Sequence, residues 1–407
     1  MTAPLAGTRI LDLSRVLAGP WATQLLADWG ADVVKVERPG AGDDTRHWGP
    51  PWHEDGPERV AAYFLACNRG KRSVAVDMAH HEGAALLRRM ALASDVVVEN
   101  FKVGGLARYG LDAASLRAAK PALVVASVTG FGQDGPSAGQ AGYDFAIQAR
   151  GGFMSVTGEA GGGPLRAGVA IADLYTGLYA ANAILAALLR RERTGEGAHI
   201  DVALLDVQAA VLANQALNYF ATGASPPRQG NTHPNIVPYQ SFAVADGEIV
   251  VAVGNDGQFR RLAALAGTDW AEDPRFSTNA ARVANRAALV PLVAAAMLGR
   301  RASDWLQALD KGGIPCAPIN DIAAVFADPQ VRHRGVRVEG DSPAYGRVPG
   351  LAPPVRLDGE APRSPRPQPG LGEHGRELLA EFGLTGAEVD ALVRAGAVQL
   401  AGSSGSL

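Results

Sequence analysis

The feature that most constrains this fold is a strand, a helix and a second strand within the first 37 residues. Residues 8–14 (TRILDLS) are an apolar run between turn formers, residues 18–30 carry apolar side chains at helical spacing, and residues 31–37 (ADVVKVE) are again strand-like. A strand, helix and strand of this length form a βαβ unit, whose two strands lie in parallel. The sequence therefore predicts an α/β fold built on a parallel sheet.

The same alternation continues as far as residue 130. Strands are expected at residues 73–78, 95–100 and 123–130, and helices at residues 80–94 and 111–121. An open, doubly wound sheet binds its ligand beyond the carboxyl ends of its strands, where arginine and lysine recur in this chain. There is no G-x-G-x-x-G after the first strand and no P-loop motif. A Rossmann-type dinucleotide enzyme or a P-loop nucleotidase therefore loses support.

A chain of 407 residues exceeds one ordinary core, so we expect two domains. Residues 223–235 are dense in Pro, Gly and Asn and are predicted to be a linker, and residues 239–254 are typical of a hairpin around Asp246 and Gly247. The expected parts are a large α/β domain at residues 1–222, a smaller α+β domain at 223–330, an extended return segment with two final helices that complete the large domain at 331–400, and a flexible tail at 401–407.

The composition argues against several classes of partner. The formal net charge of −3, without long charge runs, gives no reason to expect nucleic acid or a membrane as a partner. No leader is recognisable and the longest apolar segment is short for a membrane span, so we expect a cytoplasmic protein. Cys67 and Cys316 lie far apart and near no metal-ligand spacing, so neither a disulfide nor a metal site is expected.

Asp173 is the one carboxylate in the otherwise uncharged residues 168–180 (GVAIADLYTGLYA), between Gly168 and Gly177. A carboxylate in apolar company is costly unless it is paired, hydrogen-bonded or used in chemistry. Asp173 also precedes the clear helical pattern of residues 174–191, so it could simply cap that helix. The residues alone leave both roles open.

The turn from Gly254 to Gln258 follows the predicted hairpin and opens a helix. A glycine-containing turn at a helix start can approach a ligand closely or bind an anion, but hairpin exits often look like this without any function. A ligand role for this turn is therefore a hypothesis that composition alone does not decide.

The segments that indicate a family extend from about Leu5 to Gln399. They include residues 15–46, VENF, SVTGFGQDGP, AGYD, GVAIADLYTGLYA, RTGEGAHIDVALLD, VPYQSF, GNDGQF and LGEHGRELLAEFGL. In this order they resemble the class III CoA-transferases of the formyl-CoA transferase and carnitine CoA-transferase type. ERPGAGDDTRHWGPP, VPYQSF and PINDIAAVFADPQV look most like the branch that moves CoA from succinyl-CoA to dicarboxylates such as malate, citramalate, glutarate or hydroxymethylglutarate.

The resemblance implies an activity, a fold and a set of partners. The activity is transfer of CoA from an acyl-CoA to a carboxylic acid through aspartyl anhydride and aspartyl-CoA thioester intermediates, with Asp173 as the nucleophile. The fold is a large doubly wound domain formed by both chain ends and a smaller domain, in a homodimer of two interlocked rings. The expected partners are acyl-CoA, a small carboxylic acid and a second copy of the chain. Coenzyme A is a substrate, and no tightly bound cofactor is expected.

The resemblance also assigns site residues. Tyr143 and Asp144 match a pair near the thioester, and Leu17 replaces a polar residue of formyl-CoA transferase, which argues against oxalate as the acceptor. The substrate is expected to meet Arg15, Leu17 and a turn that resembles a mobile glycine loop, formed by Gly254, Asn255, Asp256, Gly257 and Gln258. The adenosine and phosphates of CoA are assigned to Arg38, Val76, Asp77, Met78, Asn100, Phe101, Lys102 and Arg108, with Lys71 and Arg72 as additional phosphate contacts.

Two other functions compete with this one. The α-methylacyl-CoA racemases of the same family have AGHD where this chain has AGYD, and Tyr143 is a poor replacement for a histidine acid or base. A catalytically silent CoA-binding protein is the alternative from a different class. Retention of Asp173 and of the whole CoA set weighs against it.

Overall fold

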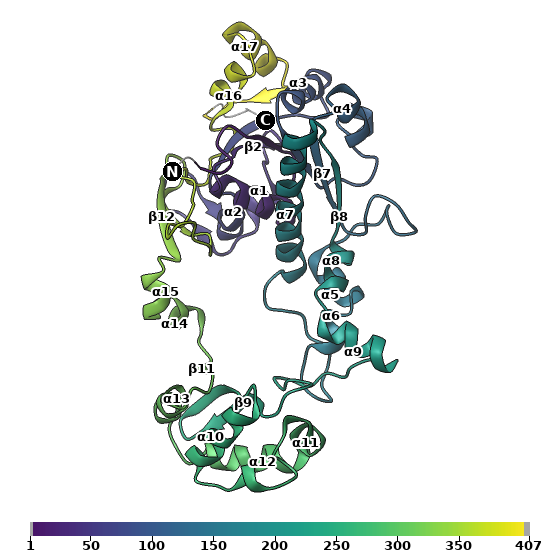
Figure 1. The fold of residues 1–407 in the computed structure, drawn as a ribbon. Helices are drawn as coiled ribbons and strands as arrows, with labels where there is room; N and C mark the ends of the chain where they lie inside the picture. The colour runs from purple at the N-terminus through teal and green to yellow at the C-terminus, as the bar shows by residue number, and fades with distance from the viewer. Residues whose placement is uncertain (1–2, 403–407) are drawn as a thin grey trace. The chain divides into compact units, whose positions relative to one another are not determined.

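The computed structural model describes residues 3–402, which divide into two units. The larger unit contains the chain up to Phe153, Arg166–Leu217 and the chain from Arg332, and the smaller unit contains Met154–Leu165 and Asn218–Val331. Figure 1 shows the course of the chain through both units. Of the tail expected at residues 401–407, the part from residue 403 on lies outside the described residues.

The division differs from the predicted one in two places. The smaller unit begins at Asn218 rather than at residue 223, and it includes the excursion Met154–Leu165. The excursion is held by the linker, because the Arg228 guanidinium donates to the Gly162 carbonyl at 2.7 Å and the Gly230 N–H donates to the Gly158 carbonyl at 2.9 Å. Arg228 and Gly162 are 66 positions apart, so no local pattern marks this contact.

A seven-stranded sheet organises the larger unit, in the order β14-β5-β2-β1-β6-β7-β8. Neighbouring strands pair in parallel, except that β14 runs antiparallel to β5. The chain begins at the centre with β1 and builds outward to both sides, as in doubly wound sheets. The predicted α/β fold on a parallel sheet is confirmed. The strands are β1 (Arg9–Asp12), β2 (Asp32–Glu37), β5 (Lys71–Val76), β6 (Val96–Glu99), β7 (Val124–Thr129), β8 (His199–Ala203) and β14 (Val398–Gln399).

Helices cover both faces of this sheet, because alternate strand residues point to opposite sides. Val96 and Val98 belong to one core cluster, and Val97 belongs to the other. The first cluster includes helices α1 (Ala18–Asp28), α5 (Asp144–Arg150), α7 (Ile171–Thr194) and α8 (Leu204–Ala210). The second includes α3 (His81–Leu92), α4 (Ala113–Ala119), α16 (Gly375–Glu381) and α17 (Gly386–Arg394).

Helices α1 and α7 cross in close contact at Gly177. A Cβ atom on Gly177 would lie 2.7 Å from the Ala18 carbonyl oxygen and 2.9 Å from Cδ1 of Trp21, so only glycine fits there. By length and composition α7 could cross a membrane, but its residues Ala172 and Ile184 have no exposed surface and belong to the first core cluster. Helix α7 is therefore a core helix of the larger unit.

The return segment from Arg332 contains more regular structure than its prolines indicate. An antiparallel hairpin of β12 (Arg337–Ser342) and β13 (Gly346–Leu351) replaces the extended path expected there. Tyr345, in the turn of this hairpin, is buried and hydrogen-bonded to the Arg46 side chain, which holds the hairpin against the N-terminal part of the same unit. The other short elements are η1 (Asp44–His47), β3 (Trp52–His53), β4 (Val60–Ala61), α2 (Ala62–Cys67), η2 (Ala107–Tyr109), α6 (Phe153–Val156) and α9 (Asn214–Thr222).

The last strand connects two loops of the larger unit. β14 pairs with the last two residues of β5. The Asp77 N–H, just after β5, donates to the Ala397 carbonyl at 2.9 Å. The Gly40 N–H, in the loop after β2, donates to Oε1 of Gln399 at 2.5 Å. The loops after β2 and β5 are thus held by residues 397–399.

The smaller unit has its own sheet and core. β9 (Tyr239–Val244) and β10 (Gly247–Ala252) form the hairpin predicted around Asp246 and Gly247, and β11 (Cys316–Pro318) pairs antiparallel with β10. Its core contains buried Phe259, Leu289 and Trp305. Its helices are α10 (Asp256–Ala266), η3 (Trp270–Glu272), α11 (Asn279–Ala284), α12 (Arg286–Met297), α13 (Ala302–Lys311), α14 (Ile322–Ala327) and α15 (Pro329–His333).

Candidate active site

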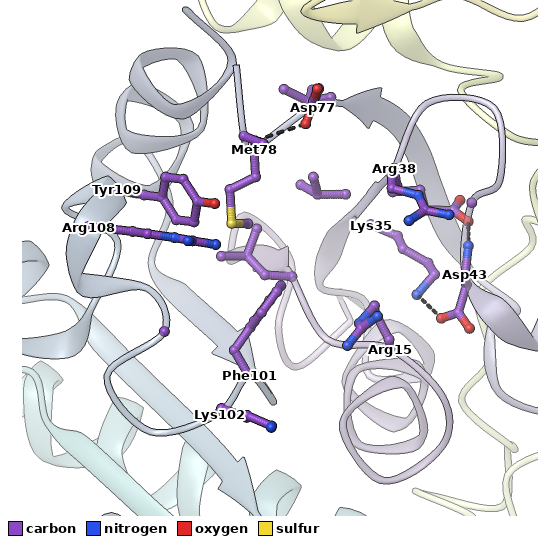
Figure 2. Close-up of a pocket in the computed structure, with 17 residues that line it drawn as sticks. Arg15, Lys35, Arg38, Asp43, Asp77, Met78, Phe101, Lys102, Arg108 and Tyr109 are labelled. Atoms are coloured by element: carbon purple, nitrogen blue, oxygen red, sulfur yellow. Dashed lines mark hydrogen bonds and ion pairs between the residues drawn. The ribbon is translucent and has the colours of Figure 1, made fainter. Parts of the chain in front are cut away.

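The loops that follow β1, β2, β5 and β6 enclose a cavity of about 510 Å³ (Figure 2). It lies at the carboxyl ends of parallel strands, where doubly wound sheets bind ligands, and its size is that of a small-molecule site. Most of the residues expected to hold CoA line this cavity, together with Tyr109, which sequence reasoning missed. The expected residues found here are Arg38, Val76, Asp77, Met78, Phe101, Lys102 and Arg108.

Three cations of this cavity have no protein counter-ion. Within residues 3–402, the side chains of Arg38, Lys102 and Arg108 form no ion pair and no hydrogen bond. The Arg108 guanidinium lies over the Tyr109 ring, 4.6 Å from its centroid. Unpaired guanidinium and ammonium groups around one cavity favour a phosphorylated ligand.

The carboxylates of the cavity wall do not cancel this charge. Glu37 forms an ion pair with Arg46 at 2.7 Å, and Asp43 forms one with Lys35 at 2.8 Å, as Figure 2 shows for the second pair. Both pairs are buried, so Glu37 and Asp43 already have their cations. Asp77, which also lines the cavity, forms no ion pair within residues 3–402 and is outnumbered by the three unpaired cations. The net charge presented to a ligand is therefore positive.

A second cavity of about 200 Å³ adjoins the first within the larger unit and contains Asp173, Tyr143 and Leu17. Asn100, the remaining member of the expected CoA set, also lines it, and its side-chain amide exchanges two hydrogen bonds with the Arg15 backbone at 3.0 and 2.7 Å. The residues common to both cavities are Arg15, Phe101 and Lys102. A long ligand can thus reach from the cation-rich cavity to Asp173.

Asp173 lies in the first turn of α7, and a different carboxylate caps that helix. Oδ1 of Asp144 accepts hydrogen bonds from the Ala172 N–H at 2.8 Å and the Asp173 N–H at 3.4 Å. The other Asp144 oxygen accepts from Nε2 of Gln148 at 2.6 Å. The interpretation of Asp173 as the cap of this helix is therefore wrong. Its own carboxylate has no hydrogen-bond partner in the described part of the chain.

The surroundings of Asp173 disfavour its charged form. Burial, and then the negative charge of Asp144, raise the pKa of Asp173 to about 7. A raised pKa makes a carboxylate more basic and therefore a better nucleophile once it is ionised. Near neutral pH, the ionised and protonated forms of Asp173 are then present in comparable amounts.

Tyr63 on α2 is a neighbour of Asp173 that sequence reasoning missed. Burial, and then the negative charges of Asp173 and Asp144, raise the pKa of Tyr63 to about 12. Its phenol therefore stays protonated and keeps a hydrogen to donate beside the two carboxylates. Tyr63 also packs edge-on against Trp48, with ring centroids 5.1 Å apart. No motif marks Tyr63, because the fold alone brings α2 near the start of α7.

Lys71 and Arg72 are not available as phosphate contacts. Lys71 has no exposed surface and donates to Asp12 at 3.0 Å. Arg72 forms ion pairs with Asp32 and Glu381, both at 2.6 Å. Both residues lie in β5 itself, so their side chains point to the faces of the sheet rather than beyond its carboxyl end. The expectation for these two residues is corrected accordingly.

The turn Gly254–Gln258 belongs to the smaller unit, whereas both cavities lie in the larger one. Its side chains hold it firmly. Asn255 accepts from the Gln258 N–H at 2.9 Å, and Oε1 of Gln258 accepts from the Gly254 N–H at 2.7 Å. Asp256 forms an ion pair at 2.9 Å with Arg282, which is fully buried. These contacts restrict the backbone of the turn, whereas a run of glycines would leave it more conformational freedom.

In residues 3–402, no group of His, Cys, Asp and Glu side chains is arranged to hold a metal ion. Cys67 is buried, Cys316 is half-buried, and both are free thiols. Burial is the largest of the effects that raise the pKa of Cys67 to about 12, so this thiol stays protonated and unreactive.

Comparisons with known proteins agree with one another. The model of CoA-transferase family III matches residues 5–375. The succinate–glutarate CoA-transferase of Agrobacterium fabrum is 52% identical over 382 residues, which cover 93% of this chain and 96% of the relative. The succinyl-CoA:mesaconate CoA-transferase of Haloarcula hispanica is 38% identical over 391 residues, which cover 92% of this chain and 96% of the relative. The crystal structure of a CaiB/BaiF family protein from Brucella suis matches with a TM-score of 0.83 and 52% identity, and covers 94% of this chain and 100% of that one.

Proposed function

The chain belongs to CoA-transferase family III, and from this we propose that it transfers CoA from succinyl-CoA to a second dicarboxylic acid, with glutarate as the first acceptor to test. The observation that carries this proposal is the pair of adjoining cavities. Unpaired cations line one cavity, and Asp173, with its raised pKa, lies in the other. The relatives that are 52% and 38% identical are named for glutarate and mesaconate, which are both dicarboxylates.

In the proposed reaction, the Asp173 carboxylate attacks the succinyl-CoA carbonyl and expels the CoA thiolate, which leaves a mixed anhydride. The thiolate then attacks the Asp173 carbonyl carbon, releases succinate and forms an aspartyl-CoA thioester. The acceptor carboxylate attacks this thioester and expels the thiolate again. Finally the thiolate attacks the acceptor's acyl carbon, which frees Asp173 and yields the new acyl-CoA. Each intermediate is hydrolysable, so the site must exclude water.

Asp144 supports this chemistry through its charge. The two carboxylates repel each other while Asp173 is ionised, and this repulsion contributes to the raised pKa. Acylation of Asp173 removes its negative charge and with it the repulsion. Asp144 therefore favours the covalent intermediates over the free enzyme while it holds the start of α7 in place. We assign Tyr143 and Leu17 to the acyl end of the substrate, because both line the cavity that contains Asp173.

The resemblance adds two further proposals, a homodimer and a role in substrate binding for the turn Gly254–Gln258. Support for the homodimer comes from α7, whose outer face carries exposed apolar side chains along its length, a feature typical of subunit interfaces. These exposed residues are Tyr175, Leu178, Tyr179, Leu185 and Leu189. Light scattering of the purified protein should give twice the chain mass of 42.2 kDa. Cytoplasmic localisation stays a prediction, as does the absence of a tightly bound cofactor.

The experiment that tests the function is a panel of acyl-CoA donors against carboxylic acid acceptors. Succinyl-CoA with glutarate should give glutaryl-CoA and succinate, and oxalate should be a poor acceptor. One chiral 2-methylacyl-CoA belongs in the panel, because racemisation without transfer would establish the racemase instead. Binding of CoA without turnover of any donor would support the catalytically silent alternative.

Arg108→Ala should raise the Michaelis constant for succinyl-CoA by about tenfold and leave kcat nearly unchanged, because one charge-assisted phosphate contact is lost far from the reacting atoms. Initial rates at varied succinyl-CoA measure this directly. Arg376→Ala is the matched control, since Arg376 is an exposed arginine on α16 that pairs with Asp390. Equal Michaelis constants in the two variants would remove Arg108 from the CoA set.

The rate of transfer at low substrate should rise with pH and level off above about pH 7, because only ionised Asp173 attacks. Asp144→Asn removes the neighbouring charge and should shift this midpoint to lower pH.

The free energy of unfolding should fall as pH rises over the same range. The pKa of Asp173 lies above its ordinary 3.8, so the folded state loses stability as pH rises from 3.8 to about 7. Asp173→Asn should lessen that loss in thermal unfolding across this range.

A further inference from the structure

The turn Ser14–Val16 joins β1 to α1 and holds an unusual backbone. Val16 has a φ of 71°, in the left-handed region that a β-branched residue strongly avoids. Such strain persists only where the surrounding contacts enforce it, and it concentrates at functional sites. This turn is well placed for such a role, because Arg15 lines both cavities and Leu17, directly after the turn, lies in the cavity of Asp173.

Side chains bind every backbone polar group of the turn, and all of them except Asp12 come from distant parts of the sequence. The Ser14 N–H donates to Asp12 at 3.0 Å, and the Arg15 N–H and carbonyl both bond to Asn100. Nζ of Lys35 donates to the Ser14 carbonyl at 3.1 Å.

The strained residue has two contacts of its own. The Val16 N–H points at both oxygens of Asp43, at 3.3 and 3.4 Å, and the Cys67 thiol donates to the Val16 carbonyl at 3.5 Å. Asp43 is in turn fixed by Lys35 at 2.8 Å and by the Thr45 N–H and hydroxyl at 3.0 and 2.7 Å.

Lys35 and Asp43 form an ion pair whose two side chains are both 0% exposed. Replacing a buried ion pair with apolar residues is often neutral or even stabilising, so stability alone is a weak reason for this pair. The pair does, however, bind the backbone of the turn on both sides of Arg15, at the Ser14 carbonyl and the Val16 N–H. Its position therefore fits the control of one local conformation better than general stabilisation.

We propose that Lys35 and Asp43 are positioning residues for CoA transfer, which hold the Ser14–Val16 turn in its left-handed conformation and thereby set Arg15 and Leu17 in the two cavities. The inference rests on the proposed function, because it assigns the pair a role in that site. Both residues line the cation-rich cavity, but their side chains are 0% exposed and paired with each other, so neither is free to bind substrate. They act through the backbone of the turn.

The test is a double-mutant cycle with Asp43→Asn and Val16→Gly, read as kcat for succinyl-CoA-dependent transfer. Glycine adopts a positive φ at little cost. With glycine at position 16, the turn therefore depends less on Lys35 and Asp43, which together form its clamp. Asp43→Asn should lower kcat by at least about tenfold in the native background and by at most about threefold in the Val16→Gly background. A general loss of stability would give the same factor in both backgrounds.

Lys71→Met supplies the matched control. Lys71 forms an equally buried ion pair, with Asp12, which accepts from the Ser14 N–H but does not bind the strained residue Val16. Its loss should not be rescued by Val16→Gly. Equal effects of Asp43→Asn in the two backgrounds, or equal rescue of Asp43→Asn and Lys71→Met, would overturn the proposal. Where Asp43→Asn does not fold, Lys35→Met takes its place, because Lys35 binds both Asp43 and the Ser14 carbonyl, and either an unchanged kcat or the absence of rescue would again overturn the proposal.

Amide hydrogen exchange over residues 14–17 separates this proposal from the proposed function, because it needs no substrate. Exchange in this segment should be faster in Asp43→Asn than in the native protein, while exchange in the smaller unit stays the same. An unchanged rate over residues 14–17 would overturn the clamp even in an active CoA-transferase. Faster exchange in Asp43→Asn, together with a native protein that transfers no CoA, would support the role of the pair in holding the turn and refute the proposed function instead.

Discussion

Asp173→Ala should lower the rate of CoA transfer by at least about a thousandfold while the protein still binds CoA. The expected loss is this large because Asp173 forms both covalent intermediates of the proposed route, and the neighbouring carboxylate cannot replace it. Asp144 is bonded through both of its oxygens, to the start of α7 and to Gln148. The proposed site for the nucleotide end of CoA is the other cavity, so a binding titration with CoA should change little.

Mass spectrometry can identify the nucleophile independently of the rate. The native protein, incubated with succinyl-CoA and then with hydroxylamine, should carry a hydroxamate on Asp173 and lose it when the acceptor acid is added first. Asp173→Asn is the control, because it keeps the shape of the side chain and removes its nucleophilic charge. A hydroxamate on another carboxylate, or more than a tenth of native transfer in Asp173→Ala, would contradict the assignment.

Gly177→Ala should lower kcat by about a hundredfold, the second largest effect that we expect, although Gly177 touches no substrate. The new methyl group would meet the Ala18 carbonyl oxygen at 2.7 Å, so α1 and α7 must separate. Asp173 lies one turn before Gly177 on α7, and Leu17 and Ala18 begin α1 on the far side of the same cavity. Shifts below an ångström between such groups cost rates of this order. Overpacking should also lower the free energy of unfolding by about 1–3 kcal/mol.

Gly386→Ala is the matched control for this substitution. Gly386 also lies in a helix of the larger unit, at the start of α17, and nothing lies within 4 Å of the Cβ that alanine would add. This variant should keep native kcat and unfold at the same or a slightly higher temperature. If Gly177→Ala loses stability but keeps native kcat, the crossing of the two helices is structural only.

The sequence predicts the strands and helices around this site well, because these elements depend on local patterns of apolar residues. Apolar runs and helical spacing place β1, α1 and β2 correctly, and parallel strands bring the residues that follow them to one edge of the sheet. Arg38, Met78, Phe101 and Arg108 come together for that reason alone. Asp173 stands out because it is the one charge in an uncharged segment.

Long-range contacts account for what the sequence does not predict. Asp144 caps a helix whose first N–H groups lie 28 positions further along the chain, and no pattern in either segment shows this. From the sequence, Lys71 looks like a basic residue near the ligand crevice. In the fold its side chain is paired with Asp12, 59 positions earlier in the chain. The positive φ of Val16 cannot be predicted from the sequence, because valine is a residue that rarely adopts a positive φ.

The contacts of β14 also fix the order in which a nascent chain can become functional. The ribosome releases the loops after β2 and β5 early, but these loops are held by Ala397 and Gln399, which emerge more than three hundred residues later. Until then, the Asp77 and Gly40 N–H groups lack the acceptors that hold these two loops of the cation-rich cavity. A chain that ends before residue 397 would contain six of the seven strands of the sheet and Asp173, but the loops after β2 and β5 would lack these two hydrogen bonds.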